Sequence, residues 1–214
     1  MGQNWNENKI ERNTLLLSTS YFPCINYIKA IYNYDSFVIE QHESYIKQSY
    51  RNRTHITSSQ GLQALSVPVV NEGSNEIIFS KKISYKEPWQ QIHFKSIRNS
   101  YKNSPWFDFL EDELAVLFEK KHTFLIDLNT EILHWTLNLL KIKREICLTN
   151  KFELQPVHWE DKRNAFHPKS EVENLETLNS YSQIFKERNG FLPNLSILDL
   201  IFAEGIKLDD YFKA

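Results

Sequence analysis

Glycine is scarce in this sequence, and several common catalytic patterns are missing with it. Only 5 of the 214 residues are glycine, and they lie too far apart to form the GxGxxG or GxxxxGK loops that hold nucleotide phosphates. The seven histidines form no HxxxH or HExxH pair, the two cysteines form no Cys-x-x-Cys pair, and no GxSxG elbow occurs. We therefore expect no metal ion, no bound cofactor and no serine-hydrolase chemistry.

Excess charge and long hydrophobic runs are also lacking. The 25 basic and 27 acidic residues give a formal net charge of −2, which provides no broad positive surface for nucleic acid. No run approaches the length of about 18 apolar residues that a membrane helix needs, and the first residues are polar and acidic, unlike a signal peptide. We expect a cytoplasmic protein with no nucleic-acid partner and no direct membrane insertion.

What the sequence does contain is enough apolar residues for one sizeable core. Hydrophobic residues make up 41% of the chain and aromatic residues 14%, and the length suits a single domain. We expect residues 1–14 to form a polar N-terminal tail and residues 15–214 to form one domain.

Hydrophobic patterns at the start of the chain predict a βαβ unit. Residues 15–21 form a short apolar run typical of a buried strand. Apolar residues then recur at helical spacing over 25–34, and residues 37–41 predict a second strand. A strand, a helix and a strand within this length are typical of one right-handed βαβ unit.

Later segments predict a hairpin and several helices. Residues 50–56 and 62–69 flank Ser58-Ser59-Gln60-Gly61, which has the composition of a hairpin loop, and residues 76–85 alternate like a further strand. Apolar residues every third or fourth position predict three helices, at residues 89–101, 106–118 and 125–139. We therefore expect a single-domain α/β fold, with a mixed β-sheet that starts with the βαβ unit and is covered by several helices.

The densest polar cluster, residues 40–53, begins at the carboxyl end of the second expected strand, where open α/β sheets bind their ligands. If residues 50–56 are extended, Arg51 and Arg53 share one strand face, and their guanidiniums form a fork suited to a phosphate or carboxylate. Lys47 would add a further positive charge. We give equal weight to the alternative that internal carboxylates neutralise both arginines and thereby fix the conformation of the loop.

Three titratable residues are candidates for acid–base catalysis. Glu40 and Glu43 could deprotonate an amine or hydroxyl before acyl transfer, although solvated surface carboxylates are the commoner case. His93 follows Trp89 on an aromatic helix face, where a histidine is more often a hydrogen-bonded core residue than a catalyst. Both interpretations stay open for each residue.

Several short blocks occur in a fixed order along most of the chain. They are Tyr21-Phe22-Pro23, Asp35-x-Phe37-Val38, Glu43-x-Tyr45-x-Lys47, Arg51-Asn52-Arg53-x-x-Ile56, Val67-Pro68-Val69, Tyr101-x-x-Ser104-Pro105-x-Phe107 and Phe191-x-Pro193-Asn194-Leu195-Ser196. With these blocks the sequence resembles the WbqC-like family. It resembles the short form, since the Ser-Gly-rich central segment of longer members is missing and Asp161-x-Arg163 occupies the corresponding region.

Members of that family are associated with O-antigen and other surface-polysaccharide gene clusters. The resemblance implies a transferase that moves a small acyl or aminoacyl group, such as glycyl, to a nucleotide-linked aminosugar. Its partners would be small molecules, a nucleotide sugar and an acyl donor. Under that hypothesis the site residues are Arg51, Arg53 and Lys47 for an anion, Asn52 and Tyr45 for the sugar, and Glu43 or Glu40 as the base, with His93 as a substitute.

Two alternatives stay open beside the transferase. One is a non-catalytic protein that binds a glycan intermediate or nucleotide sugar, because the sequence contains no complete set of nucleophile, base and orienting residue. The other is a nucleotidylyltransferase-like enzyme, because the succession of strand, Phe-Pro turn, helix and strand is similar to that fold, although its HxGH motif is missing.

Overall fold

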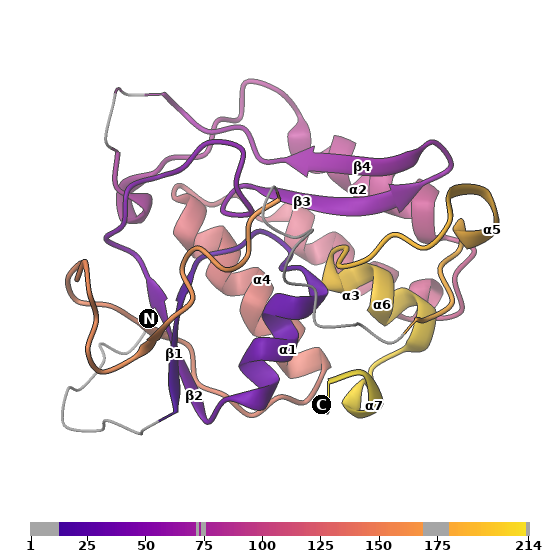
Figure 1. Cartoon of the computed structure of the whole chain (residues 1–214). Coiled ribbons are helices and arrows are strands. Elements are labelled where there is room, and N and C mark those ends of the chain that lie inside the picture. The colour runs from indigo at the N-terminus through magenta and orange to yellow at the C-terminus, as the bar shows by residue number, and fades with distance from the viewer. Residues whose placement is uncertain (1–12, 72, 74–75, 169–179, 213–214) are drawn as a thin grey trace.

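The predicted βαβ unit opens the fold, with β1 (Thr14–Ser18), α1 (Ile25–Asn33) and β2 (Ser36–Glu40) (Figure 1). The computed structural model describes residues 13–71, 73, 76–168 and 180–212, so residues 1–12 of the expected tail lie outside the described residues. Strands β1 and β2 are parallel and buried on both faces, which explains why their sequences are continuous apolar runs.

Two very short strands complete a parallel sheet of order β5-β2-β1-β6, with β5 at Cys147–Leu148 and β6 at Glu160–Asp161. The chain moves outward from β1 through β2 to β5 and then returns to the other side of β1. Strand order therefore reverses between β1 and β6. In open α/β sheets such a reversal leaves a crevice at the carboxyl ends of the strands, and ligands bind there.

The antiparallel pairing lies in a separate two-stranded sheet, the hairpin of β3 (Arg53–Ser58) and β4 (Gly61–Ser66). The α/β class, the single domain and the βαβ start are thus confirmed, with parallel and antiparallel pairs in two sheets. The strand expected from residue 50 begins only at Arg53, because the chain is still turning at Arg51. The strand expected over 76–85 is wrong: a 3₁₀ turn (Ile78–Ser80) and isolated bridges occur there.

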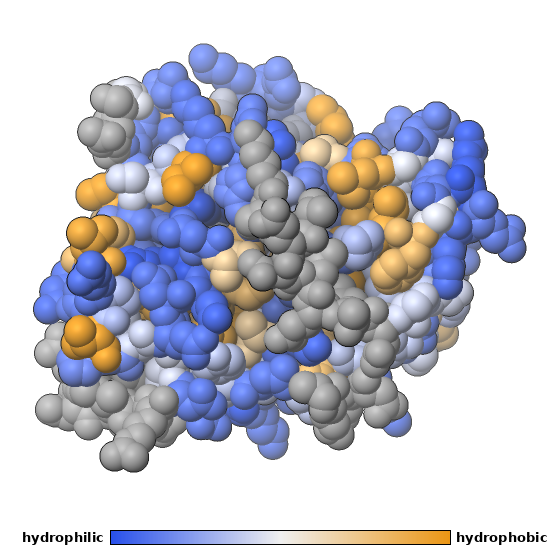
Figure 2. All heavy atoms as spheres, in the orientation of Figure 1, coloured by the Kyte–Doolittle hydropathy of each residue, from blue (hydrophilic) through white to orange (hydrophobic). Residues whose placement is uncertain are grey.

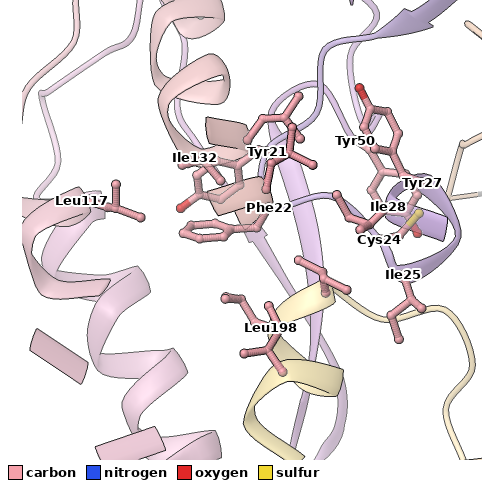
Figure 3. Close-up of a cluster of buried hydrophobic side chains, with 14 of the residues drawn as sticks. Tyr21, Phe22, Cys24, Ile25, Tyr27, Ile28, Tyr50, Leu117, Ile132 and Leu198 are labelled. Carbon is pink, nitrogen blue, oxygen red and sulfur yellow. The ribbon is translucent and has the colours of Figure 1, made fainter. Parts of the chain in front are cut away.

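Helices pack against these sheets and bury a main core, while Leu16, Val38 and Cys147 form a smaller, separate hydrophobic cluster. The three predicted helices are α2 (Trp89–Tyr101), α3 (Phe107–Glu119) and α4 (Leu125–Leu139), and the C-terminal part adds α5 (Lys186–Asn189), α6 (Ile197–Glu204) and α7 (Asp209–Phe212). Tyr21 and Phe22 lie in this core with residues of α1, α3, α4 and α6 (Figure 3). On the face drawn in Figure 2, hydrophilic residues predominate and hydrophobic ones form separate groups.

Gly205 ends α6 in a conformation that favours glycine. Its φ is +84°, and an added Cβ would lie 2.6 Å from Cε2 of Trp106. We expect Gly205→Ala to lower the free energy of unfolding by about 2–4 kcal/mol, through positive φ and steric overlap together. Urea unfolding measures this effect. Gly61→Ala is the control, because Gly61 also has positive φ but open space around it, and an equal loss in both variants would contradict the Trp106 contact.

Candidate functional site

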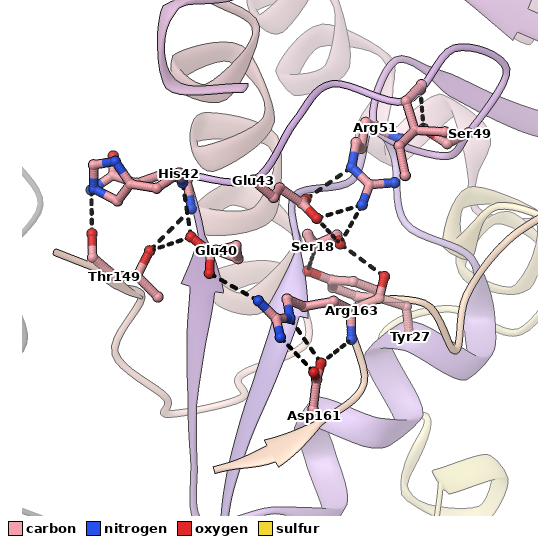
Figure 4. Close-up of polar contacts among 12 residues, drawn as sticks. Ser18, Tyr27, Glu40, His42, Glu43, Ser49, Arg51, Thr149, Asp161 and Arg163 are labelled. Atoms are coloured by element: carbon pink, nitrogen blue, oxygen red, sulfur yellow. Dashed lines mark hydrogen bonds and ion pairs between the residues drawn. The ribbon is translucent and has the colours of Figure 1, made fainter. Parts of the chain in front are cut away.

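Charged side chains from distant parts of the sequence meet at the carboxyl edge of the parallel sheet (Figure 4). Ser18 and Glu40 are the last residues of β1 and β2, and Arg163 follows β6 by two residues. Glu43 and Arg51 lie in the segment between β2 and β3. We call Ser18, Glu40, Glu43, Arg51, Asp161 and Arg163 the carboxyl-edge cluster.

Arg51 binds Glu43 through two parallel contacts. Arg51 donates from Nε to Glu43 Oε1 at 2.8 Å and from Nη2 to Oε2 at 2.5 Å, and Nη2 also donates to Ser18 Oγ at 2.8 Å. Both charged side chains are buried, with exposed fractions of 4% and 8%. Asn129 of α4 donates to the backbone carbonyl of Arg51 at 2.7 Å and so holds the turn in place. The geometry is that of a strong, desolvated bidentate ion pair.

Arg163 forms a second set of ion pairs in the same cluster. It donates from Nε and Nη2 to Asp161 at 2.9 and 2.6 Å and from Nη1 to Glu40 Oε2 at 3.3 Å. Its guanidinium lies 4.9 Å from the ring centroid of Phe152. Asp161 raises the pKa of Arg163, and Arg163 in turn lowers the pKa of Asp161.

Hydrogen bonds also connect the two ion pairs to the sheet. Glu40 Oε1 accepts from Thr149 Oγ1 at 2.7 Å and from the backbone N–H of His42 at 2.8 Å. The Ser18 hydroxyl has a single proton, which it donates either to the Arg163 carbonyl at 2.8 Å or to Glu43 at 3.1 Å. Tyr27 donates to the Ser18 carbonyl at 2.8 Å. The cluster is therefore a connected polar network.

The charges of the cluster sum to −1, because three carboxylates face two guanidiniums. The cavity beside it, at the strand-order reversal, is about 10 Å³ in volume, which is room for about one water molecule. Its lining consists of Ser18, Thr19, Ser20, Tyr27, Tyr50, Arg51, Lys162, Arg163 and Phe166. Of the two sequence interpretations for Arg51, the structure supports internal neutralisation.

Arg53 and Asn52 lie apart from this network. Arg53 begins β3 and donates from Nε to Ser66 Oγ at 3.0 Å, and Asn52 donates to the Val67 carbonyl at 2.9 Å. Because Arg51 lies in a turn rather than on β3, the two arginines do not form the expected fork on one strand face. This part of the prediction was wrong.

Tyr45 and Lys47 line a different, open depression of about 500 Å³. Lys81 also lines it, with its Nζ 4.9 Å from the ring centroid of Tyr45, and forms an ion pair with Glu76. Burial raises the pKa of Tyr45 to about 12. The residues that the sequence grouped as one binding site are thus divided between the carboxyl-edge cluster, the hairpin and this depression.

His93 lies in the aromatic core and not in the cluster. Its Nδ1 and the Tyr21 hydroxyl form a hydrogen bond of 2.8 Å, and the tautomer of the ring decides which of the two donates. Trp89 packs edge-on against it, with ring centroids 5.2 Å apart. Burial lowers the pKa of His93 to about 4, which keeps the ring neutral near pH 7. Its surroundings are those of a hydrogen-bonded core histidine.

The lowered pKa of His93 predicts a loss of stability in acid. Below pH 6.5 His93 binds a proton in the unfolded chain but not in the folded protein. The free energy of unfolding therefore falls as the pH drops from 6.5 toward 4. We expect this group to contribute a loss of up to about 3 kcal/mol. Urea unfolding of wild type and His93→Gln between pH 7.5 and 4.5 measures it. Parallel pH curves for the two proteins would contradict the assignment.

Sequence reasoning missed Arg163, Asp161 and Ser18 as site residues. Arg163 and Asp161 fall in a polar stretch where the two-residue strand β6 leaves no periodic signal. Ser18 could have been found, because it lies near the carboxyl end of a predicted parallel strand. Among the described residues, no group of three or more His, Cys, Asp or Glu side chains is placed to hold a metal ion. Nor does any helix in the described ranges have the length and apolar character to cross a membrane.

A parallel sheet with order reversal and a buried charged cluster at its carboxyl edge defines an α/β protein of the open-sheet type. The chain belongs to the WbqC-like protein family, whose model matches residues 19–165. It is similar to the uncharacterized protein Rv1507c of Mycobacterium tuberculosis (strain ATCC 25618 / H37Rv), with 27% identity over 222 residues that cover 92% of this chain and 96% of that protein. No solved structure matches the chain.

Proposed function

We propose that this protein is a transferase of surface-polysaccharide assembly, which moves a small acyl or aminoacyl group to the amine of a nucleotide-linked aminosugar. The carboxyl-edge cluster is its active site. The observation that carries the proposal is the burial of Glu40, Glu43, Arg51 and Arg163 at the strand-order reversal. Burying ion pairs costs desolvation free energy that apolar residues at the same positions would not cost. Such a network is therefore better explained by a function than by a contribution to stability.

The net charge of the cluster favours an amine over an anion as the group that approaches it. In the proposed reaction the amine nitrogen attacks the carbonyl carbon of an acyl thioester and forms a C–N bond. The C–S bond breaks, the thiolate leaves with the electron pair, and Glu43 accepts the amine proton and passes it to the thiolate. Arg51 orients Glu43 through Nε and Nη2, which leaves Nη1 for an oxygen of the substrate. Glu40 is the second candidate base.

The small cavity requires movement before a nucleotide sugar can enter. Lys162 and Phe166 line the cavity and are partly exposed, so these two side chains are the ones we expect to move. Lys162, which lies outside the cluster, then meets the phosphates, while the aminosugar reaches Glu43 and Ser18. Of the site residues that the sequence hypothesis named, the proposed active site keeps Glu40, Glu43 and Arg51. Arg163 and Ser18 are added to them.

The direct test is an acylation assay. The purified protein is incubated with UDP-linked and dTDP-linked aminosugars that carry a free amine, together with acetyl or glycyl thioesters, and the product is detected by its mass. We expect Glu43→Gln to reduce the rate at least about 100-fold, the usual effect of losing a general base. Lys47→Ala, in the separate depression, is the matched control and should keep full activity. Absence of product with every pair, or full activity of Glu43→Gln, would overturn the proposal.

One observation favours a non-catalytic binding protein as the second candidate. Each carboxylate of the cluster already has a guanidinium partner, so accepting a proton means weakening an ion pair. Calorimetry with the same nucleotide sugars distinguishes the two: binding without turnover, unaffected by Glu43→Gln, supports a binding protein. Release of pyrophosphate from ATP in the same reactions would instead support a nucleotidylyltransferase-like enzyme.

A further inference from the structure

A third hollow, separate from the cavity beside the carboxyl-edge cluster and from the depression at Tyr45 and Lys47, lies between the β3–β4 hairpin and helix α2. It is an open groove of about 710 Å³, within the size range of ligand sites. None of its lining residues belongs to the cluster or to the cavity beside it. Asn189, at the end of α5, donates to the carbonyl of Ser58 at 2.8 Å and so fixes the hairpin end beside α5 (Figure 1).

The lining of the groove is polar but carries no charge. It consists of Ser58, Ser59, Gln60, Leu62, Gln63, Ala64, Ser96, Asn99, Ser100, Asn103 and Phe185. In a chain whose residues are 24% charged, this is a locally distinct surface. Without charged groups the groove has no attraction for phosphates, nucleic acid or ionic peptides, and its amides and hydroxyls disfavour a purely apolar ligand.

One wall of the groove is formed by α2 and the turn that follows it. Ser96, Asn99 and Ser100 lie on one face of α2, and Asn103 lies in the turn two residues beyond the helix end at Tyr101. Asn99 and Asn103 are exposed, and Ser96 accepts a hydrogen bond from Gln63 across the groove at 3.4 Å. The opposite wall is the hairpin, where Leu62 is 56% exposed. Phe185 adds an aromatic ring to the lining.

We infer that this groove binds an uncharged oligosaccharide. Amide side chains present a donor and an acceptor together, which matches neighbouring sugar hydroxyls, and serine hydroxyls serve as either. Leu62 and Phe185 offer apolar contact to the C–H faces of sugar rings. The inference is independent of the proposed transferase activity, because the groove and the cluster share no residue.

The test is binding of neutral oligosaccharides to the intact chain. Maltotetraose, cellotetraose and tetra-N-acetylchitotetraose are titrated in saturation-transfer NMR and calorimetry, with a sulfated oligosaccharide and an uncharged extended peptide as comparison ligands. We expect at least one neutral glycan to bind, and Gln63→Ala combined with Asn99→Ala to weaken it by about tenfold, as the loss of one or two hydrogen bonds predicts.

Asn138→Ala is the matched control, because Asn138 is an exposed amide on α4, outside the groove. Binding should also persist in Glu43→Gln, so a failure of the groove and a failure of the transferase proposal are separable. No binding of any neutral glycan at millimolar concentration, or unchanged affinity in the Gln63/Asn99 double variant, overturns the inference. Preferential binding of the peptide overturns it as well and assigns the groove to a protein partner.

Discussion

Arg51→Met is expected to lower the free energy of unfolding by about 3–5 kcal/mol, because it leaves the Glu43 carboxylate buried without its counter-ion. The guanidinium supplies both contacts to Glu43 and one to Ser18, and Met cannot replace any of them. Urea unfolding at pH 7 measures the change. The large expected loss follows from desolvation, since the same substitution at an exposed ion pair costs about 1 kcal/mol or less.

A double variant distinguishes the effect of losing the ion pair from the effect of losing side-chain packing. Arg51→Met with Glu43→Leu removes both charges and should recover most of the loss, because no uncompensated charge stays buried. Arg53→Met is the matched control, since Arg53 is only partly buried and its Nε bonds the Ser66 hydroxyl. If Arg53→Met destabilises the protein as much as Arg51→Met does, the central position of the Arg51–Glu43 pair is contradicted.

Asp199→Ala is expected to lower the free energy of unfolding by about 3 kcal/mol, because it removes the acceptor of several buried donors. Asp199 lies in the first turn of α6 and accepts from the hydroxyls of Tyr101 at 2.7 Å and Tyr181 at 2.6 Å, and from Gln183 at 3.1 Å. The carboxylate thus joins α2, α6 and the segment before α5. Thermal and urea unfolding of the variant measure the effect, and a change below about 1 kcal/mol would show that the network contributes little.

The raised pKa of Asp199 makes the free energy of unfolding depend on pH. Burial raises its pKa above the ordinary value, so the folded protein binds the proton more tightly than the unfolded chain does. The stabilisation that this proton provides is fully present below the pKa that Asp199 has in the unfolded chain. It is lost as the pH rises through the pKa that Asp199 has in the folded protein. Asp199→Asn cannot titrate there. As the pH is lowered from 7 toward 4, we therefore expect wild type to gain stability relative to Asp199→Asn, and no relative change would contradict the raised pKa.

Local sequence patterns were sufficient to predict most of the longer helices and strands. The βαβ start, the hairpin and α2, α3 and α4 follow from apolar spacing, which depends only on neighbouring residues. The ends of α6 carry local signals too, because the Ser196 hydroxyl accepts from the backbone N–H of Leu198 and Gly205 follows the last turn. The segment 76–85 misled because its residues alternate enough to resemble a strand, while its backbone turns at Ile78–Ser80.

The candidate site was only partly predictable. Glu40, Glu43 and Arg51 lie near the carboxyl edge of the sheet, as their position just after the second predicted strand indicated, and their role as a site stays a prediction. Tyr45, Lys47 and Arg53 were grouped with them because they are near in sequence, yet turns around residues 47–52 direct them to other places. Arg163 could not be grouped at all, because β6 is too short to produce a pattern.

The sequence by itself determined most of the longer helices and strands, and that polar residues follow the second strand, because backbone geometry and hydrophobic spacing act over a few residues. Only the tertiary structure decided which charges meet. Arg163 lies 123 positions from Glu40 and pairs with it because β6 returns to the side of β1 opposite β2. An ion pair depends on distance in space, and the same arginine can face a ligand or a carboxylate without any change in its sequence neighbours.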